Sequence, residues 1–178
     1  MGSATTQALA ASTQALAAVT ASVDIDTARE LFAAGDAIGN SRQLAAVLAD
    51  PAVEASAKSK LVGSAFGTSV SATTLGLLTT VAAQRWSSPS DLLAGIEELG
   101  LRAASLSSLR SGADVEGELF QFARTVTDNP ELELTLGARI GSNAAKGKLI
   151  DTLLGGRASV ETTLIISSLV QQPRGRRV

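Results

Sequence analysis

The feature that most constrains this chain is a segment that it contains nearly twice. Residues 50–62 read DPAVEASAKSKLV, and residues 138–150, 88 positions later, read ARIGSNAAKGKLI. At the same interval, ELF occurs at both 30–32 and 118–120. Further pairs are Asp26 with Asp114, Leu44 with Leu132, Leu48 with Leu136, and Gly67 with Gly155. Most of these positions are apolar residues or helix ends, which decide a fold, so each copy should form the same group of elements.

The repeat predicts how the chain is divided. After the paired glycines, we expect one additional residue in the second copy to shift the interval to 89, so that TTL at 73–75 corresponds to TTL at 162–164. The sequence therefore predicts an N-terminal helical module over residues 3–87 and a second, duplicated helical module over residues 88–178.

The periodicity of both modules is helical. A seven-residue repeat, TQALAAS followed by TQALAAV, puts Leu9 and Leu16 on one face of a helix expected over about residues 4–20. Apolar residues recur in steps of three and four over residues 92–106, which predicts an amphipathic helix at the corresponding place in the second copy. No stretch shows the sustained alternation of a half-buried strand. The predicted fold class is all-α, with two similar helical-bundle modules related by an internal duplication.

Three prolines are expected to begin helices. Pro51, Pro89 and Pro130 each follow Asp, Ser or Asn, and such an N-cap residue before a proline is typical of a helix start. Ser88 and Asp91 also resemble a capping box.

The absent residue types exclude most kinds of catalytic site. The chain has no Cys, His or Tyr, which excludes thiolate chemistry, histidine bases and nearly every zinc site. GSNAAKGKL at 141–149 loosely resembles a phosphate-binding loop, but five residues separate its glycines where four are required, and Leu149 follows Lys148 where Ser or Thr is required. Adjacent acids such as Glu97 and Glu98 do not face each other on a helix. We predict a non-catalytic protein with no catalytic residues, cofactor or metal.

Charge and hydropathy also limit the partners. Lys plus Arg is 15 and Asp plus Glu is 17, a net charge of −2, whereas nucleic-acid binders concentrate positive charge. The basic tail containing Arg174, Arg176 and Arg177 is the local exception. The uncharged stretches 3–23 and 61–84 contain too much Ser, Thr, Gln or Gly for a membrane span. We predict neither a nucleic-acid partner nor a transmembrane segment.

The repeated segments resemble a known family. An acidic helix with ELF, then LAAVLADPAVEASAKSKLVGSAFG and VSATTLGLLTTVAAQRW, is similar to the N-terminal domain of the delta subunit of bacterial ATP synthase, the homologue of the mitochondrial oligomycin-sensitivity-conferring protein. The residues that fit the family pattern are Leu44, Leu48, Pro51, Lys60, Leu61 and Gly67. NPELELTLGARIGSNAAKGKLIDTLLGG fits it again, except that Arg139 stands where the first copy has Pro51. The junction QRWSSPSDLL is similar to that of longer delta subunits with a duplicated helical portion.

The resemblance implies a non-catalytic stator subunit of a proton-translocating ATP synthase. In this family the domain binds the N-terminal helix of an alpha subunit of the catalytic head in a groove between its first and fifth helices, here about 4–20 and 72–86. The groove residues that the resemblance implies are Leu9, Leu16, Leu75, Leu78, Val81 and Trp86. Each could instead be a core residue, Trp86 could simply cap the module, and the duplicate helix 161–172 could replace 72–86 as the groove wall.

The resemblance also implies further partners and a location. The stalk b subunit is normally bound through a C-terminal domain with a Gly- and Val-rich stretch, and nothing in this chain looks like that domain, so we expect a truncated form. The location implied is peripheral, on the cytoplasmic face of an energy-coupling membrane. The alternative is a generic helical-repeat scaffold for another partner, but such solenoids usually need three or more units.

Overall fold

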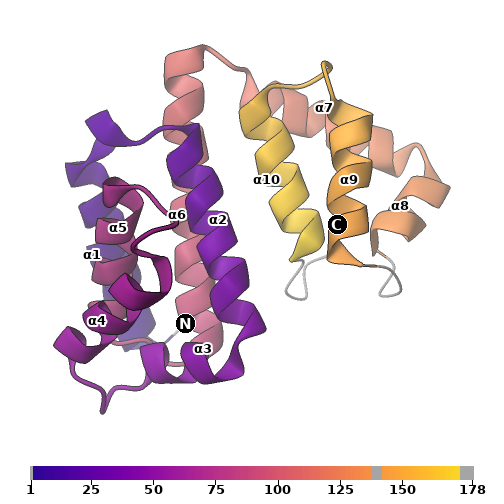
Figure 1. Ribbon diagram of the computed structural model, residues 1–178. Coiled ribbons are helices and arrows are strands. Elements are labelled where there is room, and N and C mark those ends of the chain that lie inside the picture. Colours follow the sequence, from indigo (N-terminus) through magenta and orange to yellow (C-terminus); the bar gives the residue numbers. More distant parts are fainter. Residues whose placement is uncertain (1, 138–141, 173–178) are drawn as a thin grey trace. The chain divides into compact units, whose positions relative to one another are not determined.

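The computed structural model describes residues 2–137 and 142–172, in which all regular structure is helical (Figure 1). The elements are α1 (Ser3–Ala18), the 3₁₀ turn η1 (Thr20–Ser22), α2 (Ile25–Asn40), α3 (Arg42–Ala49), α4 (Ala55–Phe66), α5 (Ala72–Ala83), α6 (Pro89–Ser111), α7 (Val115–Thr127), α8 (Pro130–Gly137), α9 (Asn143–Leu154) and α10 (Val160–Gln171). The all-α class is confirmed. Arg139 and the basic tail lie outside the described residues.

The helices recur at one constant interval. The helices α8, α9 and α10 have the lengths of α3, α4 and α5 and begin 88 residues after them. The predicted shift to 89 is therefore wrong. Ser71 and Ser159 are the N-caps of α5 and α10. The side chain of each accepts a hydrogen bond from the backbone N–H of the residue three positions later, Thr74 or Thr162. Because these caps set the register, Thr162 corresponds to Thr74 and not to Thr73. The common ancestry of the two copies stays a prediction.

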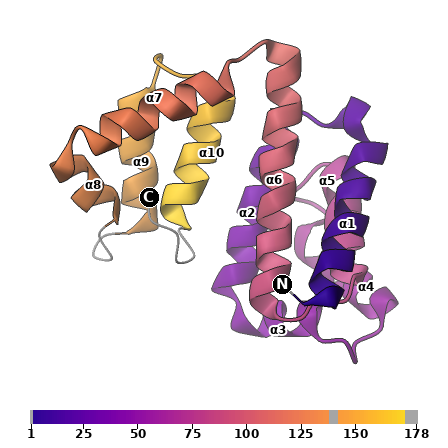
Figure 2. The ribbon, with the colours of Figure 1, turned by 180° about the vertical axis from the view of Figure 1, so that it is seen from behind.

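The chain forms two compact units, residues 1–106 and 107–178. The helix α6 contributes to both. Its apolar stripe is buried in the first unit, where Figure 2 shows α6 running beside α1 and α2: Leu92, Ile96, Leu99 and Ala103 are each at most 1% exposed. The compact units divide within α6. The predicted boundary between residues 87 and 88 refers to the sequence repeat, and it stays a prediction.

In the first unit α5 is the central helix and contacts α1, α2, α3 and α4. Its apolar residues fill the core together with those of α2 and α3; the large buried side chains include Leu31, Ile38, Leu48, Leu77, Leu78 and Val81. Two glycines let α6 approach closely. A Cβ at Gly100 would lie 2.8 Å from the Phe32 ring, and one at Gly95 would overlap the Trp86 ring.

The second unit has a smaller core. Its cluster consists of Val126, Leu136, Ile150, Ile166 and Val170. These residues come from α7, α8, α9 and α10, and α9 and α10 pack side by side (Figure 1). Partly buried apolar residues of α7, α8 and α9 complete the cluster.

The proline predictions have different outcomes. Pro89 and Pro130 begin α6 and α8 as predicted. Ser88 supplies the N-cap half of the predicted capping box: its Oγ accepts from the Asp91 N–H at 3.1 Å, and it donates to Oδ2 of the same residue at 2.9 Å. The prediction for Pro51 is wrong, because the Asp50 carboxylate accepts the Ala52 N–H at 2.8 Å and holds a turn. The next helix begins only at Ala55.

Candidate functional site

The helices expected to form the groove, α1 and α5, pack against each other. Leu9 of α1 and Leu75 of α5 are half-buried, so both retain solvent-exposed apolar surface. By contrast, Leu16, Leu78 and Val81 are at most 2% exposed and belong to the core. Of the predicted groove residues on α1 and α5, only Leu9 and Leu75 therefore keep solvent-exposed surface.

Trp86, the only tryptophan, is 4% exposed. Its Nε1–H donates to the Val81 carbonyl oxygen at 2.8 Å, so the indole closes the C-terminal end of α5. The ring packs against Gly95 of α6. Trp86 thus joins α5 to α6 and exposes almost none of its surface.

One carboxylate ties α2 to α5 in the first unit. Glu30 accepts hydrogen bonds from the backbone N–H of Ser71 at 3.0 Å and from its hydroxyl at 2.7 Å. It also accepts from the Thr74 hydroxyl. Ser71 and Thr74 lie 41 and 44 positions after Glu30 in the chain, so this set of hydrogen bonds, the glutamate tie, depends on the tertiary fold. Glu30 therefore stabilises the start of α5, whose first N–H groups lack partners within the helix.

The second unit contains the same tie. Glu118 accepts from the Ser159 N–H at 3.0 Å, from the Ser159 hydroxyl at 2.6 Å, and from the Thr162 hydroxyl. The sequence analysis found ELF twice but did not predict this role. The available signal was a Ser-x-x-Thr cap placed 41 residues after each glutamate.

Both ties lower the pKa of their glutamate. Desolvation raises the pKa of Glu30, but hydrogen bonds from Thr74 and Ser71 outweigh it. For Glu118, desolvation likewise acts upward, and hydrogen bonds from Ser159 and Thr162 bring the pKa below its ordinary value. A carboxylate that accepts several hydrogen bonds favours its charged form.

In each unit a hollow lies beside this glutamate, and the helices that line the first hollow have their counterparts around the second. In the first unit it measures about 340 Å³ and is lined by Arg29, Glu30, Ala33, Ala34, Ala37, Phe66, Ser69 and Val70. In the second it measures about 180 Å³; seven of its lining residues lie 88 positions after residues of the first: Glu118, Gln121, Phe122, Thr125, Leu154, Arg157 and Ala158. Gln121 and Phe122 line the second hollow where the first unit has alanines.

Of the repeated lysines, Lys58 is buried and Lys146 is partly buried, whereas Lys60 and Lys148 are exposed. Lys146 donates from Nζ to the Leu136 carbonyl oxygen at 2.9 Å, so it satisfies the C-terminal end of α8. Its counterpart Lys58 is 3% exposed and is therefore buried. Desolvation lowers the pKa of Lys58, although the nearby Asp50 carboxylate acts in the opposite direction.

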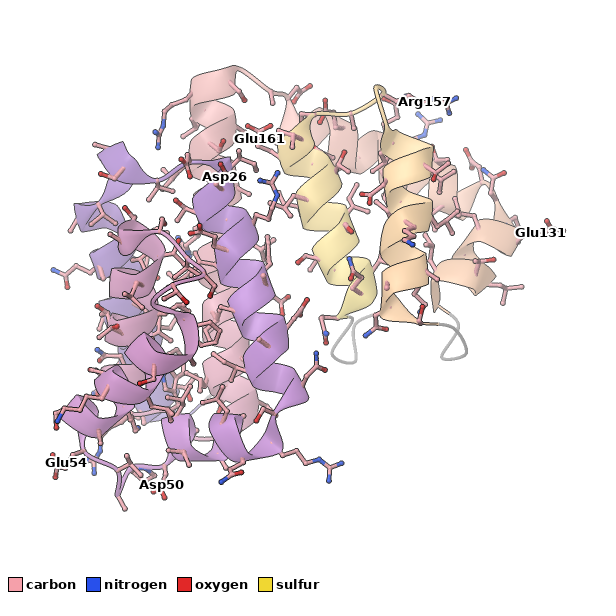
Figure 3. All side chains as sticks on the ribbon, in the orientation of Figure 1. Asp26, Asp50, Glu54, Glu131, Arg157 and Glu161 are labelled. Carbon is pink, nitrogen blue, oxygen red and sulfur yellow. The ribbon has the colours of Figure 1, made fainter. Side chains whose placement is uncertain are left out.

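Two further acidic residues, Glu98 and Glu161, have structural contacts. Glu98 pairs with Arg102 at 2.8 Å. Glu161 lies at the start of α10 (Figure 3) and accepts from the hydroxyls of Ser107 and Ser111 at 2.9 Å each. Across residues 2–137 and 142–172, no group of three or more acidic residues could hold a metal ion. In the same part of the chain, no helix combines the length and apolarity that crossing a membrane requires.

Comparison with known proteins identifies the family. No protein-family model matches the sequence. The chain is 45% identical to the ATP synthase subunit delta of Leifsonia xyli subsp. xyli, over all of this chain and 67% of the relative. It is 39% identical to that of Streptomyces avermitilis, over 97% of this chain and 65% of the relative, and 39% identical to that of Streptomyces griseus, over 99% and 67%. The chain spans about two thirds of the length of these relatives. It belongs to the family of ATP synthase delta subunits.

Proposed function

We propose that this chain is a non-catalytic stator component of a proton-translocating ATP synthase that binds the N-terminal helix of an alpha subunit along α1 and α5. The observation that carries the proposal is the similarity to delta subunits along the whole chain. In this proposal the protein is peripheral to the membrane, on its cytoplasmic side. Contact with the stalk b subunit belongs to the part of the relatives that this chain does not cover.

The surface around Leu9 and Leu75 supports this proposal. Two packed helices that keep one leucine each partly open provide anchor points for an amphipathic helix, whose apolar residues recur at every third or fourth position. Burying the exposed part of each leucine contributes at most about 1 kcal/mol, since full burial contributes about 1.5–3 kcal/mol. The contact carries no charge from these helices, because neither α1 nor α5 contains Asp, Glu, Lys or Arg.

The test is a titration of the whole chain with a synthetic peptide of the cognate alpha-subunit N-terminus, followed by calorimetry and by Trp86 fluorescence. Saturable one-to-one binding is expected, and Leu9→Asp or Leu75→Asp should weaken it at least about tenfold, a loss of about 1.4 kcal/mol. Leu134→Asp is the matched control, because Leu134 is an exposed leucine, at 74%, of the second unit.

Circular dichroism must show that all variants keep the helical content of the wild type. Equal binding by Leu9→Asp, Leu75→Asp and the wild type would move the contact away from α1 and α5. If the peptide does not bind the wild-type chain at all, the proposal is wrong for this chain.

A further inference from the structure

The last turn of α6 has a counterpart of different structure in the first unit. At the interval of 88 residues, Ala18 corresponds to Leu106. The helix α1 ends at Ala18 and the 3₁₀ turn Thr20–Ser22 follows it, whereas α6 continues past Leu106 to Ser111. The division between the two compact units also lies directly after Leu106. Corresponding places in the chain therefore have two structures, a helix end and a continued helix.

The residues of this turn do not explain why the helix continues. Residues 107–111 read SSLRS, and serine favours caps and turns over helix interiors because its hydroxyl competes for backbone groups. Leu109 is 79% exposed. The apolar core cluster of the second unit takes its residues from α7, α8, α9 and α10. Neither helix propensity nor apolar burial therefore stabilises this turn strongly.

Glu161 supplies a polar contact to this turn. The carboxylate lies in the first turn of α10 and is 3% exposed, and its Oε1 accepts the hydroxyls of Ser107 and Ser111, each at 2.9 Å. Hydrogen bonds to a charged acceptor are roughly twice as strong as those between neutral groups. The first unit lacks all three groups, because the corresponding residues are Thr73, Val19 and Val23. The contact thus occurs only in the copy whose helix continues.

We infer that Glu161 is a latch that holds residues 107–111 in α6, and that α6 ends at Leu106 when the latch opens, as α1 ends at Ala18. With the latch closed, residues 112–114 connect α6 to α7; with the latch open, residues 107–114 connect them. The latch therefore sets the length of the connection between the two compact units. Opening leaves the apolar cores intact, because no buried apolar residue belongs to this turn. The inference does not rest on the contact proposed for α1 and α5.

Amide hydrogen exchange of the full chain tests the latch. Residues 107–111 should exchange at least about tenfold faster in Glu161→Ala than in the wild type, because their N–H groups lose their helical acceptors when the turn opens. Glu161→Gln keeps a neutral acceptor and should give a smaller increase. The matched control is Glu131→Ala, which removes an exposed acid from the first turn of α8 and should leave residues 107–111 unchanged.

A second variant separates the latch from helix propensity. Ser107→Ala combined with Ser111→Ala removes both donors, but it raises the helix propensity of the turn. The latch predicts faster exchange of residues 107–111 in this double variant, whereas propensity alone predicts slower exchange. When Glu161→Ala has already opened the latch, adding the same two substitutions should instead slow the exchange.

Acceleration confined to residues 107–111, with residues 92–106 and the helices α9 and α10 unchanged, supports the latch. Unchanged exchange of residues 107–111 in Glu161→Ala overturns it, as does slower exchange in the double serine variant. Acceleration that extends equally through α9 and α10 also overturns it, because Glu161 then stabilises the second unit as a whole. If Glu161→Ala does not fold, the double serine variant alone decides.

Discussion

Glu30 and Glu118 make the same hydrogen bonds, yet the phenylalanine two residues after each has opposite surroundings. Phe32 is 7% exposed and Phe120 is 66% exposed. Other large exposed apolar residues of the described chain, Leu109, Leu134 and Val160, also lie in the second unit. At the interval of 88 residues the first unit has alanine at all three corresponding positions. The hydrogen bonds of the glutamate are thus repeated in both units. The burial of the phenylalanine is not repeated, because it depends on which helices pack against it.

The largest expected effect contrasts the two phenylalanines. Phe32→Ala should lower the free energy of unfolding of the first unit by about 3–5 kcal/mol, because it removes a buried ring and leaves a cavity. Phe120→Ala should change the stability of the second unit by no more than about 0.5 kcal/mol. Denaturant unfolding, followed by Trp86 fluorescence for the first unit and by hydrogen exchange of α7 for the second, measures both. Equal losses would show that Phe120 is buried in solution.

The second prediction concerns the close packing of α6 against Trp86 in the first unit. Gly95→Ala should destabilise it by about 1–3 kcal/mol, because the added methyl group overlaps the buried Trp86 ring. Gly63→Ala in α4 is the control, since no atom lies within 4 Å of the new Cβ, and it should stabilise the helix by up to about 1 kcal/mol. Thermal unfolding measured by circular dichroism compares the two. Stabilisation by Gly95→Ala would contradict the tight packing of α6.

The third prediction tests whether the two ties are equivalent. Glu30→Ala and Glu118→Ala each leave the start of α5 or α10 without its acceptor, which should cost about 1–3 kcal/mol. The two losses should agree within about 0.5 kcal/mol, because the partners and distances match. Chemical denaturation of each variant gives the values. A negligible loss in only one unit would mean that the ties are not equivalent.

The smallest effect is the pH dependence of these ties. Because the pKa of each glutamate is lower in the folded chain, its stabilisation is fully present above the unfolded pKa of about 4.3. It is lost as the pH falls through the lower folded value. Between pH 6 and about 3, the double variant Glu30→Gln, Glu118→Gln should therefore lose less stability than the wild type. An identical acid profile would contradict the assignment.

The sequence predicted features that neighbouring residues determine. The cap of α6 by the Ser88 side chain and the start of α6 at Pro89 depend on contacts within one helical turn, and both were predicted correctly. The Pro51 prediction failed because the Asp50 side chain favours a turn at the same residues. The predicted register of α10 was wrong because TTL can be aligned in more than one way. Only the cap between Ser159 and Thr162 decides between these alignments.

Features that depend on distant residues could not be predicted in the same way. The repeated glutamate was visible, but its partners lie 41 or more residues away. Each of the six predicted groove residues could be core or surface; the structure buries Leu16, Leu78, Val81 and Trp86. Leu9 and Leu75 stay partly exposed, and this depends on how α1 packs against α5, which the sequence alone does not give.

The span of each glutamate tie has a consequence for folding kinetics. Closing a 41-residue loop costs entropy before the hydrogen bonds form, so the tie is expected to form late, after the intervening helices have docked. Removing Glu30 should then accelerate unfolding and leave the folding rate nearly unchanged, which corresponds to a φ-value near zero. Because Glu118 closes a loop of the same length, the second unit is an internal replicate of the same kinetic experiment.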